Sequence, residues 1–340
     1  MAEKKKSLLL AALAAVGALI VSAAVLYGLE RSARTRIVDA LIYRDSELPA
    51  LRFEPIPGAR GELEGVPVHL NGRGLRDREI PVARPPAVKK RIVVLGDSIT
   101  FARGVPPESA FPKKWEQFLG PSYEVINAGV CAYNGEQELA FFDVRLADLK
   151  PDLVVLALTP DDFEDVPPTR FHFPRLKNFL RERSAFARSL MERSYRKRFA
   201  RSTVPSGLAY AASPVRAPKS GARKVAGEKP VDVRDAILAR ARGLLEKAGK
   251  LAETRQLRLV VLYVPRLDRI NTDPADVERR EALRRSSAEL RRPFWDAFDA
   301  LTAGLITENL LDLQNPYLSE KGHATLAQFI ADRARREGIL

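Results

Sequence analysis

Short runs of apolar residues alternate along the chain with longer segments in which apolar positions recur every three or four residues. The short runs predict buried strands at 91–95, 123–126, 153–158 and 257–264. The longer segments predict helices at 108–119, 135–149, 232–255, 274–290, 294–303 and 321–336. Strands that alternate with helices and are apolar throughout are typical of a parallel, doubly wound sheet covered on both faces. The predicted fold class is therefore α/β.

The N-terminal pattern predicts a membrane anchor. Ser7 to Leu29 is a run of 23 uncharged, mostly apolar residues that follows Lys4-Lys5-Lys6, and about 20 such residues can span a bilayer as a helix. A cleaved signal peptide with a site near Val21-Ser22-Ala23 is the alternative. Apolar character continues past that site to Tyr27, which favours an uncleaved anchor. We expect the remaining chain on the periplasmic or extracellular side of the membrane.

Composition along the chain divides the rest of the protein into segments. Residues 30–50 suggest a helical stalk, and 51–89 are rich in Gly, Pro and Arg with short extended pieces. The predicted segments are an anchor at 1–29, a stalk and lead-in at 30–89 and a globular domain at 90–340. Within that domain we expect a basic amphipathic helix at 175–200 and a Ser/Pro/Ala/Lys-rich flexible linker at 201–230.

The net charge of +13 lies in one part of the chain. Residues 170–229 contain 16 Lys and Arg against three acidic residues, so the remainder is balanced. This distribution argues against a nucleic-acid partner. It fits a solvated helix face followed by a basic linker, or a segment that contacts anionic lipid headgroups. The single cysteine, Cys131, excludes an internal disulfide framework, and no cofactor or metal is predicted.

The turn after the first predicted strand carries the candidate chemistry. Gly96-Asp97-Ser98-Ile99-Thr100 delivers a serine to the carboxyl edge of the sheet, which is where open α/β sheets bind ligands. Acyl transfer by serine needs a base and hydrogen-bond donors for the oxyanion. The backbone N–H groups of Ser98 and Gly129 and the side chain at 161 are candidate donors.

These residues resemble the SGNH, or GDSL, hydrolase family, whose members hydrolyse esters of lipids, acylated sugars and related compounds. The resemblance lies in Val93-Val-Leu-Gly-Asp-Ser-Ile-Thr-Phe101, in Glu124-Val-Ile-Asn-Ala-Gly-Val130 and in the upstream Leu70-Asn-Gly-Arg-Gly-Leu-Arg-Asp77, which looks like the lead-in of membrane-anchored bacterial members. It implies a flavodoxin-like three-layer sandwich, with Ser98 as nucleophile and Gly129 as an oxyanion donor.

Two blocks depart from the pattern of that family. Asp161, in Thr159-Pro-Asp-Asp162, stands where the family has an oxyanion-binding asparagine. An ionised Asp161 has no proton to donate and would repel the oxyanion. Tyr317 stands where the family has its histidine base, and Gln314 where it has the aspartate partner. A phenol with a reference pKa near 10 is a poor base at neutral pH.

Of the three histidines, His323 and His172 are the alternative bases, whereas His69 is expected to be structural or exposed. His323 is expected in the first turn of the last helix, His172 after the third strand, and His69 ahead of the domain. Two functions therefore remain open: an esterase acting on O-acyl esters of lipid or cell-envelope glycan, and a non-catalytic relative that serves as a membrane-tethered binding or scaffolding module.

Overall fold

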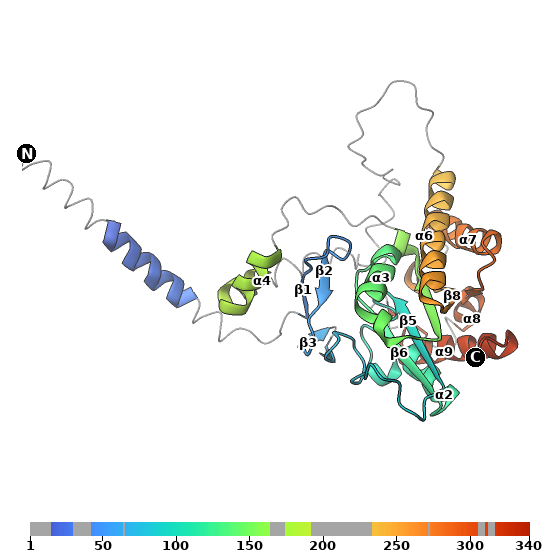
Figure 1. The fold of residues 1–340 in the computed structure, drawn as a ribbon. Helices are drawn as coiled ribbons and strands as arrows, with labels where there is room; N and C mark the ends of the chain where they lie inside the picture. Colours follow the sequence, from blue (N-terminus) through green and yellow to red (C-terminus); the bar gives the residue numbers. More distant parts are fainter. Residues whose placement is uncertain are drawn as a thin grey trace, which may run out of the picture.

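Five parallel strands form the central sheet of the protein (Figure 1). They are β5 (Lys90–Gly96), β6 (Tyr123–Gly129), β7 (Leu153–Leu158), β8 (Arg258–Tyr263) and β9 (Phe294–Asp296). Their order across the sheet is β6-β5-β7-β8-β9. Every residue of β7 is buried, as expected for a central strand that is covered on both faces. The predicted parallel α/β sheet is confirmed.

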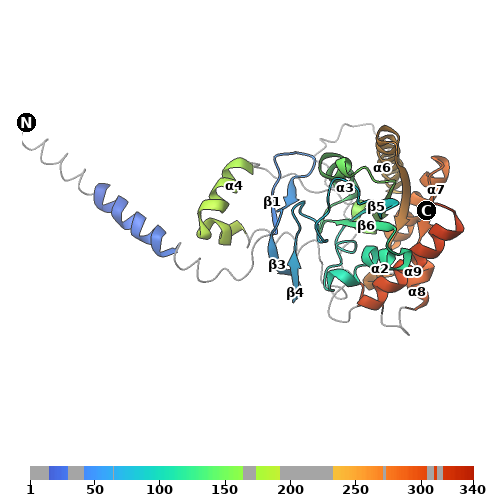
Figure 2. The same cartoon turned by 60° about the horizontal axis from the view of Figure 1, so that its bottom comes forward.

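Helices cover both faces of this sheet (Figure 2). One layer consists of α2 (Phe111–Leu119), α8 (Phe298–Ala303) and α9 (Glu320–Arg336). The other consists of α3 (Gly135–Phe141), α6 (Val233–Arg255) and α7 (Pro274–Glu289). Each layer buries its apolar side chains against one side of the strands, so two hydrophobic cores flank the sheet. The arrangement is a three-layer sandwich.

The computed structural model describes most of the chain but not all of it. The described residues are 15–29, 42–63, 65–163, 174–191, 233–270, 273–304, 310–311 and 317–340. The predicted linker at 201–230 lies outside these ranges. The predicted basic helix at 175–200 is described to residue 191, as α4 (Pro174–Arg183) followed by a helical stretch at 185–191.

The described part of the predicted stalk and lead-in folds back onto the sandwich as two small hairpins. These pair β1 (Tyr43–Asp45) with β2 (Phe53–Pro55), and β3 (Arg60–Leu63) with β4 (Val66–His69). The predicted helical stalk is therefore wrong at 43–45, and residues 30–41 lie outside the description. Leu51, Leu70 and Leu75 are fully buried in the same core as the sheet. Tyr43 accepts a hydrogen bond from the N–H of Cys131 at 3.2 Å, so the lead-in belongs to the domain.

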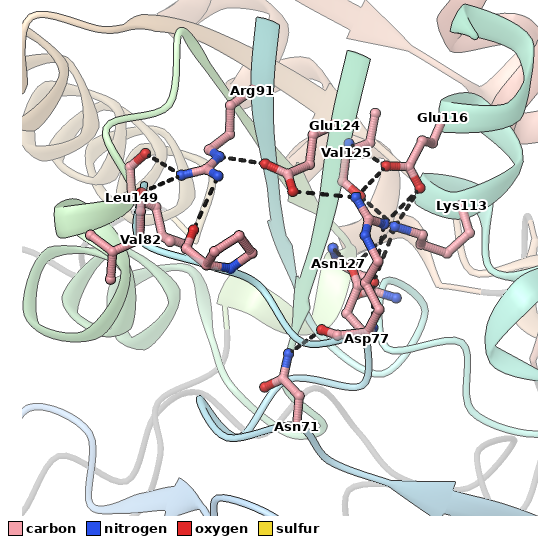
Figure 3. Close-up of polar contacts among 12 residues, drawn as sticks. Asn71, Asp77, Val82, Arg91, Lys113, Glu116, Glu124, Val125, Asn127 and Leu149 are labelled. Carbon is pink, nitrogen blue, oxygen red and sulfur yellow. Dashed lines mark hydrogen bonds and ion pairs between the residues drawn. The ribbon is translucent and has the colours of Figure 1, made fainter. Parts of the chain in front are cut away.

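A buried polar network fastens residues 71–82 to the sheet (Figure 3). The Arg91 side chain on β5 is fully buried and forms an ion pair with Glu124 on β6. The same guanidinium donates to the carbonyl oxygens of Val82 and Leu149, both at 2.9 Å. Asp77 accepts the N–H of Asn127 at 2.8 Å and contacts the Lys113 ammonium at 3.1 Å. These contacts give buried polar groups the partners that they need.

Two predicted helices differ in detail from those observed. The range 294–303 begins as the short strand β9, which continues the sheet beside β8, and becomes helical only at α8. Trp295 in that strand is fully buried, with its ring centroid 6.4 Å from that of Trp115. The range 135–149 is α-helical only to Phe141, and continues as a π-helical turn and then a 3-10 turn.

Residues 15–29 form an exposed helix. Its apolar side chains include Leu19, Ile20 and Tyr27, each more than 60% exposed. Among the described residues, no helix is long and apolar enough to cross a membrane. Residues 7–14 of the predicted anchor lie outside the description, so the anchor stays a prediction.

Candidate active site

Ser98 lies on a tight turn directly after β5, as the sequence predicts. The turn is closed by Asp97, whose carboxylate accepts the N–H of Ile99 at 2.8 Å. A side chain at position 96 would lie 2.0 Å from Thr100 Oγ1, so Gly96 lets the turn fold back over the end of the strand. Ser98 itself is half-buried. Because the chain crosses from one side of β5 to the other on its way to β7, this edge is the topological switch point of the sheet.

Gly129, at the end of β6, lies against the serine turn but has its N–H already engaged. That N–H donates to Asn127 Oδ1 at 3.0 Å. A side chain at position 129 would lie 2.2 Å from the backbone nitrogen of Phe101. The close approach of β6 to the serine turn therefore explains this glycine, whereas its predicted role as an oxyanion donor would require the bond to Asn127 to break.

A different residue in the turn after β6 has an unengaged backbone N–H. Ala132 has a φ of 64°, a left-handed conformation that is uncommon for a residue other than glycine. Within the described part of the chain, neither the Ala132 N–H nor the Ser98 N–H has a hydrogen-bond acceptor. The Val130 N–H donates to the Gly96 carbonyl oxygen at 2.9 Å and so joins the two strand ends. Two such donors at one edge suit an oxyanion.

Three buried carboxyl groups lie behind the serine turn. Thr159 Oγ1 is 3.2 Å from a carboxylate oxygen of Asp97 and 3.2 Å from one of Asp162. Burial, together with the charge of Asp161, raises the pKa of Asp97 to about 6. Burial also raises the pKa of Glu138 and that of Asp162 well above their ordinary values, and charge repulsion within the group adds to both shifts. These three carboxyls therefore hold their protons to higher pH than exposed carboxyls do.

Asp161, the predicted site residue on the turn after β7, forms an ion pair with Arg266. The Arg266 guanidinium also contacts both carboxylate oxygens of Asp268, each at 2.9 Å. The Arg266 side chain is only 10% exposed. The repulsion that a lone Asp161 would exert on an oxyanion is therefore offset by an adjacent cation. Asp161 nevertheless acts here as an acceptor, whereas the asparagine that the resemblance leads us to expect would donate.

Tyr317 lies against Arg103 and Gly104, which follow the serine turn in the chain. Its ring packs beneath the Arg103 guanidinium, with 5.1 Å from Arg103 Cζ to the ring centroid. A side chain at Gly104 would come within 4.0 Å of the same ring. Tyr317 is 4% exposed. Its predicted partner Gln314 lies outside the described residues.

Neither of the two histidines that the structure describes has the contacts of a catalytic base. His323 Nδ1 accepts the N–H of Phe111 at 3.3 Å, and the two rings stack. Burial, with a smaller effect from Arg76, lowers the pKa of His323 to about 3, so this histidine is neutral and joins α2 to α9. His69 is exposed on β4, and His172 lies outside the described residues.

A groove of about 830 Å³ is lined by no residue of the serine turn. It runs between the β3–β4 hairpin and α2, and its lining includes His69, Arg76 and Lys113. Within the described ranges, no group of three or more His, Cys, Asp or Glu side chains is placed to hold a metal ion.

No family model matches the chain, and no curated protein matches it. Solved structures do resemble it. A lipase/acylhydrolase from Enterococcus faecalis matches at 15% identity and a TM-score of 0.44, over 73% of this chain and 96% of that one. A carbohydrate acetylesterase from Sinorhizobium meliloti matches at 14% and 0.43, over 73% and 99%. A member of the lipolytic G-D-S-L family from Veillonella parvula matches at 13% and 0.41, over 72% and 96%. Likenesses this distant assign no activity to the chain.

Sequence reasoning missed Arg266, Ala132 and Glu138. Arg266 follows β8 at the same edge as Ser98, so the rule that placed the serine there would also have placed the arginine. Ala132 gave no signal, because alanine rarely adopts a left-handed conformation. Glu138 resembled an ordinary solvent-facing residue of a helix.

Proposed function

We propose that the protein is a serine ester hydrolase of the SGNH type, with Ser98 as the nucleophile. One observation carries this proposal: a half-buried serine stands at the switch point of the sheet, and its own N–H and that of Ala132 are both unengaged. Backbone donors at a strand end suit the negative charge that develops on a carbonyl oxygen during acyl transfer.

The reaction follows from this arrangement. Ser98 Oγ bonds to the ester carbonyl carbon and loses its proton, and the alcohol leaves with a proton as the acyl-serine forms. Water then attacks the acyl-serine and releases the acid. We assign proton acceptance to the phenolate form of Tyr317, whose ring packs beneath the Arg103 guanidinium just after the serine turn. A phenol supplies little phenolate at neutral pH, so slow turnover is expected.

The proposed substrates are O-acyl esters of lipid or of cell-envelope glycan. The support comes from the N-terminal apolar run, which would hold the domain at a membrane on its periplasmic or extracellular side. The exposed apolar face of residues 15–29 is consistent with such an anchor.

Fluorophosphonate labelling of the full chain in detergent tests the nucleophile. The reagent bonds covalently to activated serines, so we expect labelling of the native protein and none of Ser98→Ala. Ser184→Ala, which changes a serine on the 174–191 segment, is a matched control that should label like the native protein. A folded native protein that takes up no label would contradict the proposal.

A non-catalytic binding module is the second candidate. Two observations favour it. Among the described residues, no histidine lies at the serine turn. In addition, Asp161, at the position expected to hold an oxyanion-binding asparagine, is engaged in an ion pair with Arg266. Under this alternative, Asp161→Asn, Tyr317→His and Gln314→Asp together would leave a folded, unlabelled protein. Under the esterase proposal, the same triple variant gains labelling and turnover.

A further inference from the structure

Helix α4 presents its apolar side chains to solvent. Leu176, Phe179 and Leu180 are 57%, 50% and 40% exposed. Their spacing of three and four residues places them on one face of the helix. None of the residues of α4 is buried. A surface helix of a globular domain ordinarily directs this face inward, so α4 has the reverse orientation.

The polar side of α4 is the side that contacts the domain. The Lys177 ammonium lies 2.6 Å from a carboxylate oxygen of Asp45 in β1. Asn178 donates to the Asp45 carbonyl oxygen at 3.0 Å. The helix is thus held at a fixed place on β1 by polar contacts, and within the described ranges its apolar face stays exposed.

The charges around this face favour an anionic partner. Residues 174–191 contain five basic residues and one acidic residue, Glu182. Arg183 lies at the border of the apolar face, with its guanidinium carbon 4.5 Å from the centroid of the Phe179 ring. Arg175 is 86% exposed and pairs at the surface with Glu47, at 3.3 Å. An apolar stripe bordered by arginines is typical of helices that lie in the interface of a membrane.

The N-terminal apolar run would hold α4 close to such a surface. Residues 30–42 separate that run from β1, and when fully extended they span at most about 45 Å. Both views place α4 on the side of the domain that faces the helix of residues 15–29 (Figures 1 and 2). This step rests on the anchor described under the proposed function, whereas the orientation and charge of α4 do not.

We propose that α4 lies flat on an anionic membrane surface, with Leu176, Phe179 and Leu180 inserted between the headgroups. The arginines around this face contact the lipid phosphates. The contact fixes the orientation of the domain on the membrane, in addition to the tether.

A tryptophan reporter in the full chain tests this contact. Trp115 and Trp295 are both fully buried, so they supply a constant background to a Phe179→Trp variant. Vesicles of phosphatidylcholine alone are compared with an equal mixture of phosphatidylcholine and phosphatidylglycerol, each with and without acyl-brominated lipid. The matched control is Val277→Trp, at a position on α7 that is 58% exposed.

We expect a blue shift and bromine quenching of the reporter at position 179 on the anionic vesicles, reduced on the neutral ones and unchanged in the control. Adding Arg175→Gln and Arg183→Gln should abolish the difference between the two lipids. Equal behaviour of the reporter in both lipids, or no change in either, overturns the proposal. Release of the whole protein from anionic vesicles at high salt would support the α4 contact and contradict the N-terminal membrane anchor. Fluorophosphonate labelling of Ser98 is scored separately and does not depend on either outcome.

Discussion

Under the proposed function, the group that accepts the Ser98 proton is the phenol of Tyr317. A phenol ordinarily titrates near pH 10, and only its ionised form accepts a proton. We expect the rate of fluorophosphonate labelling to rise with pH across the neutral and alkaline range. Tyr317→His should move this rise to near pH 6.5, the ordinary pKa of histidine, and increase the rate at pH 7 by about tenfold or more.

The control for this prediction is Tyr317→Phe, which keeps a ring beneath Arg103 and removes the hydroxyl. It should label more slowly than the native protein at high pH while unfolding at the same denaturant concentration. A rising pH profile that persists in Tyr317→Phe would show that another group accepts the proton.

The buried carboxyl of Glu138 predicts a pH-dependent stability. Its pKa is raised in the folded protein above the ordinary value of 4.5, so folding retains a proton that the unfolded chain releases. The resulting stability is complete below about pH 4.5 and is lost as the pH rises through the folded pKa. Glu138→Gln removes this loss, so we expect its free energy of unfolding to fall less between pH 5 and pH 8. Urea titrations across this range provide the measurement.

Glu136→Gln, on the same helix, is the matched control. The Glu136 side chain is 57% exposed and pairs with Lys247 at the surface. It should follow the native pH dependence. If both variants do so, the Glu138 carboxyl is ionised in the folded protein and this account fails.

Among single residues, local pattern identified the serine but not its surroundings. Ser98 was predictable because a strand, a glycine and a serine are adjacent in the sequence. The pairing of Asp161 with Arg266 joins residues from different strand ends, and the single sequence carries no record of it. Gly129 was assigned to catalysis because it is a glycine near a strand end, although its packing against Phe101 already accounts for it.

At the scale of elements, the Arg91–Glu124 pair joins β5, β6 and the lead-in. Replacing Arg91 with Met would leave the buried Glu124 carboxylate and the carbonyls of Val82 and Leu149 without this donor. Breaking a buried pair typically costs about 3–5 kcal/mol. We expect a loss of this size in urea unfolding, and partial recovery when Glu124→Leu is added.

A surface pair supplies the comparison. Arg255 and Asp143 are each 44% exposed at the side chain, and exposed pairs contribute about 0–1 kcal/mol. Arg255→Met should therefore leave the unfolding midpoint almost unchanged. Equal losses in the two variants would mean that burial does not govern the Arg91 contact.

The central strands were predictable to within a few residues because they are continuous apolar runs. The edge strand β9 was not, since Phe294–Asp296 has only three residues and is fixed by its pairing with β8. The strands of the lead-in hairpins have only three or four residues, and their packing against distant parts of the chain overrides weak local preference.

At the scale of the whole molecule, the docked lead-in sets the minimum folding unit. Leu51, Phe53, Leu70 and Leu75 are all buried in the shared core. A chain that begins at residue 42 should unfold cooperatively, whereas one that begins at residue 90 exposes the apolar surface that these residues cover. We expect the shorter chain to lose cooperative unfolding in urea. Cooperative unfolding of both chains at the same midpoint would show that the lead-in is energetically separate.

Cys131 lies against Tyr43 of β1. The only thiol in the protein can therefore report whether the first hairpin is docked on the sheet. Burial is the main reason that its pKa is raised to about 11, and its N–H is held by Tyr43. Alkylating reagents reach this sulfur only while the first hairpin is detached. The alkylation rate of the native chain therefore measures how often the leading segment separates from the sheet.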